Sequence, residues 1–184
     1  MRSGERAPLP VDSNAIRDLL IIFAVHNVEE VAHLPADVAR YQQFFDRMGA
    51  RKDWLQRDVM SIATASLTAL CAVSLSRARR RPGPVGDGVA IAVCAALGGN
   101  ALTHAARAAA DLGYNGGLAT SPALLWAAWR LGRQATSHRS LSPGQVLAVL
   151  VAANAVVPPL IIASLATAHR LVCRLSPTLE GVPR

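Results

Sequence analysis

Four ionisable side chains lie close together in an otherwise apolar stretch near the N-terminus: His26, Glu29, Glu30 and His33. If residues 16–34 form a helix, all four share one face about 100° wide, because successive residues turn by about 100°. His26 and Glu30 are then an i,i+4 pair, the spacing at which two helical side chains reach one ion, and Glu29 and His33 are a second such pair. Imidazole and carboxylate groups are ligands of zinc and iron, so the pattern predicts a metal site.

A second polar stripe follows in the sequence about 75 residues later. Asn100, His104, Arg107 and Asp111 lie within about 60° of one another on a helix expected over residues 88–110. This helix runs parallel to the first if two membrane crossings separate their starts. Both stripes occupy the C-terminal halves of their helices, so we expect them to lie at similar depth and to form one polar pocket.

The residue types assign a role to each member of this pocket. We expect one divalent metal, zinc or iron, bound by His26, Glu30 and His104. Glu29 is the candidate general acid or base, since two adjacent carboxylates in a low-dielectric site do not both ionise easily. Arg107 is the candidate group for an anionic headgroup or for developing negative charge. Supporting positions are His33, Asn100, Asp111 and Tyr114.

Three other interpretations use the same residues. The first is a buried network in which the glutamates pair with Arg107 and the histidines are hydrogen-bonded between helices. The second is a metal-free isomerase or cyclase with Glu29 and Glu30 as proton donor and acceptor. The third is a small proton or ion transporter that uses the stripe as a relay. A charged side chain at the centre of a membrane helix costs roughly 2.5–3.5 kcal/mol, which argues against an accidental arrangement.

The elements that must hold these side chains are indicated by four long runs without any Asp, Glu, Lys or Arg. The runs are 59–76, 88–106, 112–129 and 141–168. About 20 apolar residues are needed to cross a bilayer as a helix, so each run predicts a membrane helix. A soluble helical bundle is the alternative, but it needs polar residues at every third or fourth position, and 141–168 has few.

The predicted architecture is therefore all-α: a single polytopic membrane domain over residues 1–184 with about five transmembrane helices. A short helix is expected between the first and second of them, in segment 40–57, because Tyr41, Phe44, Phe45 and Met48 recur at helical spacing. It either lies in the membrane interface or packs on the bundle as a solvent-side loop helix. A tail is expected at 170–184. The helices are expected at about 16–34, 58–76, 88–110, 117–132 and 143–169.

Composition restricts the function classes. Hydrophobic residues make up 52% and charged residues 17% of the 184 residues, which excludes a disordered chain and an ordinary soluble enzyme. The net charge of +7 is carried almost wholly by arginines at helix ends and in loops, a distribution typical of membrane anchoring, and we expect no nucleic-acid partner. Membrane lipid is the expected partner. Ala95 and Gly99 form a small-xxx-small pair suited to a homo-oligomer.

Three segments together resemble a known family. They are His26-Asn27-Val28-Glu29-Glu30, the later Asn100 and His104, and the turn Tyr114-Asn115-Gly116-Gly117-Leu118-Ala119-Thr120. This pattern is similar to the HXXEE-domain family of small bacterial membrane proteins. The resemblance covers most of residues 16–120 and implies an integral protein of the bacterial inner membrane. It departs from the family at Gly116, where proline is common, and it implies no activity.

These observations lead to one functional hypothesis. We expect a membrane-embedded, metal-dependent enzyme that acts on a lipid-like or isoprenoid-like small molecule through the intramembrane His/Glu site.

Overall fold

The computed structural model describes residues 10–47 and 51–175, except for the side chains of 41–45 and 52. The described chain is helical without strands, which confirms the all-α prediction. Its elements are α1 (Ser13–Arg47), the 3₁₀ turn η1 (Lys52–Leu55), α2 (Arg57–Arg80), α3 (Pro84–Asp111), α4 (Ser121–Ser137) and α5 (Pro143–Leu175).

Four helical segments are long and apolar enough to cross a membrane: Ser13–Arg40 of α1, and all of α2, α3 and α5. These segments indicate a membrane protein. The fifth expected span, α4, has 17 residues. It is therefore only about 25 Å long, against about 30 Å for the hydrocarbon core of a bilayer.

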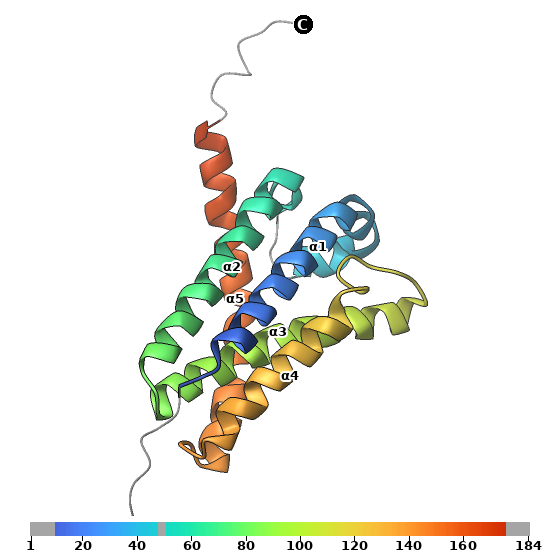
Figure 1. The fold of residues 1–184 in the computed structure, drawn as a ribbon. Helices are drawn as coiled ribbons and strands as arrows, with labels where there is room; N and C mark the ends of the chain where they lie inside the picture. Colours follow the sequence, from blue (N-terminus) through green and yellow to red (C-terminus); the bar gives the residue numbers. More distant parts are fainter. Residues whose placement is uncertain (1–9, 48–50, 176–184) are drawn as a thin grey trace, which may run out of the picture.

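The helices pack as a bundle with α3 at its centre. α3 contacts α2, α4 and α5, while α1 lies against α2 and α4 (Figure 1). His26 of α1 meets Asn100 of α3, and Glu30, one turn later, meets His104, so the two helices advance in the same direction. This confirms the parallel arrangement predicted for the two polar stripes.

The main hydrophobic core lies at the end of α1 opposite to these polar contacts. It joins α1, α2, α3 and α4 through side chains that are almost completely buried, among them Leu19, Leu75, Ile91, Leu124 and Leu131. A second, smaller cluster joins α2 to the later part of α5 and includes Val59 and Leu165. The main core therefore fixes the two helices, α1 and α3, that carry the polar side chains of the site.

The short interfacial helix expected in segment 40–57 is not a separate element. α1 continues without interruption through Pro35 to Arg47, and η1 follows after the gap in the described residues. Proline inside a helix removes one backbone hydrogen bond. The turn of α1 beyond Pro35 is instead held by tertiary contacts, because Asp37 and Arg40 bind the backbone of the loop after α3. The expectation rests on the side chains of Tyr41, Phe44 and Phe45 and on Met48, and these lie outside the described part of the chain.

Other helix boundaries also differ from the expected ones. α4 begins at Ser121 instead of 117, because the preceding residues form a loop that side chains of α1 hold in place. α5 extends through the consecutive prolines Pro158 and Pro159 to Leu175, into the expected tail. The remainder of that tail lies outside the described residues.

Candidate functional site

Three predicted metal ligands meet between α1 and α3. His26 and Glu30 are one turn apart on α1, and His104 faces them from α3. Glu30 Oε1 lies 2.6 Å from His104 Nε2 and 3.5 Å from His26 Nε2. The three ligand atoms all lie within 4.8 Å of one another. Both rings are buried, at 0% exposure for His26 and 7% for His104. The prediction that these residues come together is confirmed.

The amide of Asn115 fixes the tautomer of the His104 ring. Asn115 Nδ2 donates to the His104 backbone oxygen at 3.0 Å, which leaves Oδ1 facing the ring, 2.8 Å from Nδ1. An oxygen acceptor at that distance requires a hydrogen on Nδ1. In the neutral ring Nε2 then carries a lone pair, and that lone pair points at Glu30.

Thr120 fixes His26 in the same way. The Thr120 hydroxyl lies 2.7 Å from Glu29 Oε2 and 2.8 Å from His26 Nδ1. An ionised carboxylate only accepts hydrogen bonds, so the hydroxyl donates to Glu29 and accepts from His26 Nδ1. Nε2 of His26 is therefore also left with a lone pair directed into the centre.

With both rings neutral, the three side chains present only acceptor atoms to one another. Two imidazole lone pairs and one carboxylate converge, while Asn100 supplies a single amide donor, with Nδ2 2.9 Å from His26 Nε2 and 3.5 Å from Glu30 Oε1. Two acceptor atoms 2.6 Å apart, as in the Glu30–His104 pair, repel each other unless a cation lies between them. A proton meets this requirement at 2.6 Å, and a metal ion would meet it once the two atoms move apart to about 3.4 Å.

Gly117 forms the wall of the centre on the side of the loop. Its φ is +89°, a conformation that strains residues with a side chain. A Cβ atom at this position would lie 2.7 Å from His26 Cε1 and 3.1 Å from His104 Nε2. Only glycine lets the backbone come this close to both rings.

Glu29, the expected acid or base, points away from the centre. Its carboxylate accepts hydrogen bonds from the backbone nitrogens of Ala119 and Thr120, both at 3.0 Å, and from the hydroxyls of Thr120 and Tyr114. These donors lie at the N-terminus of α4, where free N–H groups and the helix dipole favour a negative charge. Because both oxygens accept hydrogen bonds from the loop, the geometry gives Glu29 a positioning role, and its acid–base role stays a prediction.

Two further residues of α1 bind the same loop. Asp37 Oδ2 accepts a hydrogen bond from Gly116 N at 2.8 Å, and Arg40 donates to the backbone oxygen of Tyr114 at 2.6 Å. The hydrogen bond to Glu29 raises the pKa of the Tyr114 phenol, and partial burial and the charge of Glu29 act in the same direction. We call Glu29, Asp37 and Arg40 the loop clamp.

The remaining predicted residues lie around the centre without entering it. His33 is exposed; its Nδ1 lies 3.0 Å from the Glu29 backbone oxygen, and its ring packs against Tyr114. The second i,i+4 pair, Glu29 with His33, is therefore not assembled as an ion site. Asp111 is exposed at the end of α3, and Arg107 is half-buried one turn after His104.

The roles of Asn115 and Thr120 were not foreseen from residue types. Both lie in the loop between α3 and α4 rather than on a polar helix face, so helical periodicity does not find them. The signal that marks them is the segment Tyr114–Thr120 itself, with two consecutive glycines between them. Gly116 is also closely packed against α1, because a Cβ there would lie 2.8 Å from Asp37 Oδ2 and 3.1 Å from Glu30 Cα.

Comparison with known proteins identifies the family without adding an activity. No curated protein and no solved structure matches the chain. The family described as "Protein of unknown function with HXXEE motif" matches residues 19–129, more than half of the chain. This segment includes the motif residues His26, Glu29 and Glu30, their partners on α3, and the loop that holds them. The chain therefore belongs to the HXXEE family of proteins of unknown function.

Proposed function

We propose that the centre between α1 and α3 binds one divalent metal ion, zinc or iron, through His26 Nε2, Glu30 and His104 Nε2. The observation that carries this proposal is the convergence of one ligand atom from each of these three residues, all within 4.8 Å of one another. The hydrogen bonds that Nδ1–H of both imidazoles donates to oxygen atoms support it further, because a metal-binding histidine characteristically donates its other ring N–H to such an acceptor.

The spacing of the ligand atoms fits such an ion after a small adjustment. Two ligand atoms about 2.1 Å from a tetrahedral ion lie about 3.4 Å apart. The distance of 3.5 Å between His26 Nε2 and Glu30 Oε1 agrees with this value. The His104–Glu30 distance would have to open from 2.6 Å to a similar value, by rotation of the Glu30 side chain. Rotation of the Asn100 amide would exchange its donor for an oxygen, as a further ligand.

The substrate class in this proposal is a lipid-like or isoprenoid-like molecule, in a protein of the bacterial inner membrane. The candidate spans on both sides of the centre, in α1 and α3, support an apolar substrate that enters from the bilayer. Glu30 is the most exposed of the three ligands, at 19% of its side chain, and marks the side of approach. A bound metal ion would supply Lewis-acid chemistry or lower the pKa of a water molecule. Arg107 would bind an anionic group of the substrate.

Metal analysis of the protein purified in detergent tests the proposal. We expect one zinc or iron ion per chain, and loss of this metal in His26→Ala and Glu30→Ala. His33→Ala is the matched control, because it removes a histidine from the same helix that does not enter the centre. A folded wild-type protein without metal after growth with both metals, or equal loss in the control, would contradict the proposal.

The second candidate function is proton transfer without a metal ion, in which His104 and Glu30 share one proton. The same 2.6 Å contact favours it, since a proton between His104 and Glu30 also removes the repulsion. The pair would then act as an acid–base catalyst or as one step of a proton relay. Proton flux in proteoliposomes that persists with chelator and disappears in Glu30→Gln would favour this function over metal catalysis.

A further inference from the structure

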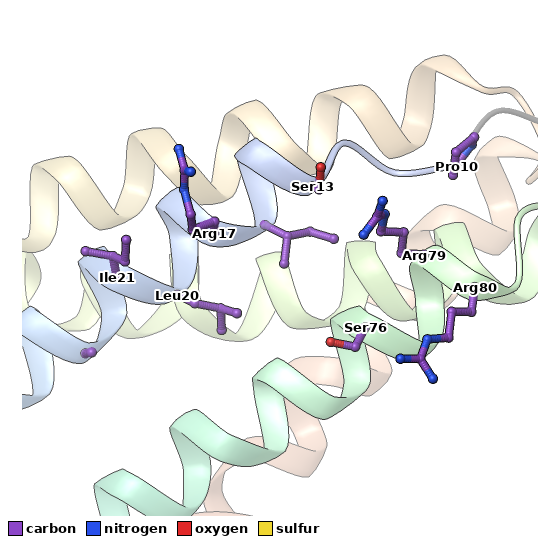
Figure 2. Close-up of a pocket in the computed structure, with 10 residues that line it drawn as sticks. Pro10, Ser13, Arg17, Leu20, Ile21, Ser76, Arg79 and Arg80 are labelled. Atoms are coloured by element: carbon purple, nitrogen blue, oxygen red, sulfur yellow. The ribbon is translucent and has the colours of Figure 1, made fainter.

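A groove separate from the candidate centre opens between the first turns of α1 and the last turns of α2. Its volume is about 790 Å³, within the range of about 300–1,000 Å³ typical of small-molecule sites. Figure 2 shows the wall formed by α1, with Leu20 and Ile21 at one end, and the polar side chains of α2 at the other. The groove is thus apolar at one end and polar at the other.

The polar end carries positive charge that no carboxylate of the described residues pairs with. Arg79 and Arg80 lie in the last turn of α2, and within the described residues neither forms an ion pair. Arg17 also borders the groove, but its guanidinium lies 3.7 Å from Asp18 and points away in Figure 2. Arg79 extends from α2 toward the beginning of α1, where Ser13 adds a hydroxyl group.

The apolar end lies deeper along the two helices. It is lined by Leu20, Ile21 and Ala24 of α1. Beyond Ala24 the two helices are joined by a hydrogen bond of 2.8 Å from Asn27 Nδ2 to Thr68 Oγ1. Ile21 is 55% exposed, so the groove is open at the side where a bilayer would surround the helices.

The position of the groove matches the layers of a membrane. The candidate span of α1 begins at Ser13 and that of α2 ends at Arg80, so the polar end lies at a membrane boundary. The apolar end lies within both spans. A ligand that fits must therefore have an anionic head at the surface and an apolar chain directed inward, as a phospholipid has.

From this match of charge and depth we infer that the groove binds an anionic glycerophospholipid. Arg79 and Arg80 bind its phosphate, and one acyl chain lies along Leu20, Ile21 and Ala24. The lipid is not the substrate of the candidate centre, because His26 lies about 200° around α1 from Ala24. The site stands whether or not the centre binds a metal ion.

Native mass spectrometry of the protein in neutral detergent tests this inference. Phosphatidylglycerol and phosphatidylcholine with identical acyl chains are the two probes. We expect the wild-type protein to retain phosphatidylglycerol more tightly. Each basic residue near an anionic lipid contributes about a fivefold change in affinity, so R79Q/R80Q should weaken retention of phosphatidylglycerol about 25-fold.

The double variant R77Q/R81Q is the matched control. It removes the same charge from the same end of α2, but neither residue lines the groove. We expect it to stay within about twofold of wild type. Ala24→Phe, which fills the apolar end, should weaken retention of both lipids and provides an independent test if R79Q/R80Q does not fold.

Three outcomes would overturn the inference. The first is equal retention of the two lipids by the wild-type protein, which would show no selection for negative charge. The second is equal loss in the two double variants, which would show a general effect of charge. The third is displacement of the lipid by inorganic phosphate at similar concentration, which would show a site for a free anion.

Discussion

Glu29 of α1 binds Thr120 through two hydrogen bonds, from the Thr120 backbone nitrogen at 3.0 Å and from its hydroxyl at 2.7 Å. The same hydroxyl accepts from His26, so the first and fourth residues of the HXXEE motif are joined through a residue of the α3–α4 loop. The two glutamates of the motif thus differ in what they do. Glu30 takes part in the centre, while Glu29 holds the loop that orients His26.

The Thr120 hydroxyl should control metal affinity without being a ligand. Thr120→Val keeps the size of the side chain but removes the acceptor for His26 Nδ1. We expect metal affinity, measured by competition with a chelator, to fall about 10- to 100-fold. Thr136→Val is the control, since its hydroxyl bonds only to a backbone oxygen of its own helix. Equal affinity in the two variants would show that Thr120 does not act on the centre.

Gly117 should be intolerant of any side chain. Gly117→Ala places a Cβ 2.7 Å from the His26 ring on a backbone with φ of +89°. We expect a loss of about 1–3 kcal/mol in the free energy of unfolding, measured by thermal unfolding in detergent. Gly144→Ala in the first turn of α5 meets no atom within 4 Å and should leave stability unchanged or slightly higher. A stable Gly117→Ala protein would mean that the loop lies farther from the rings.

Removal of the Glu29 charge should loosen the loop rather than empty the centre directly. Glu29→Gln replaces an acceptor of four hydrogen bonds by an amide that cannot accept all of them. We expect a loss of about 1.5–3 kcal/mol in the free energy of unfolding, typical of hydrogen bonds to a charged group, and faster hydrogen exchange at Ala119 and Thr120. Asp111→Asn, at an exposed position, is the control. Exchange rates that do not change would exclude the clamp role.

The ionisation of Tyr114 should report on the same contact. Only the protonated phenol donates to Glu29, so the pKa of Tyr114 is raised above its ordinary value. The stability from this contact is complete below the ordinary tyrosine pKa of about 10 and is lost as the pH rises through the higher folded-state pKa.

Ultraviolet titration measures this shift directly. The chain has two tyrosines, so Tyr41→Phe leaves Tyr114 alone to be observed. We expect its midpoint to lie above the ordinary value and to move down in Glu29→Gln. If the Tyr114 midpoint is the same with Glu29 and with Glu29→Gln, the hydrogen bond between Tyr114 and Glu29 does not form in solution.

The centre itself follows from the sequence because helices have a fixed period. His26 and Glu30 are one turn apart, and His104 faces them from another helix. The number of charge-free runs predicts that this helix is parallel to the first. The same period separates Glu29 from Glu30 by about 100°, which is why adjacent glutamates contact different partners. Helical geometry and the number of predicted membrane crossings therefore locate the candidate ligands.

The residues that orient the ligands do not follow from the sequence in this way. Asn115 and Thr120 depend on the backbone path of a loop, which is set by Gly117 at positive φ and by contacts with α1. Pro35 gives a wrong prediction of where the first helix ends. A proline favours a helix end at the preceding residue, but α1 continues through it to Arg47. Tertiary contacts from Asp37 and Arg40 offset that local preference, and they are not visible before the fold is known.

The uninterrupted length of α1 has a consequence for where its end lies. Its 35 residues extend about 52 Å, well beyond the roughly 30 Å of a hydrocarbon layer. The candidate span of α1 ends at Arg40, so the remaining residues up to Arg47 extend past the apolar layer. Arg40, which binds the loop after α3, therefore lies at the membrane boundary.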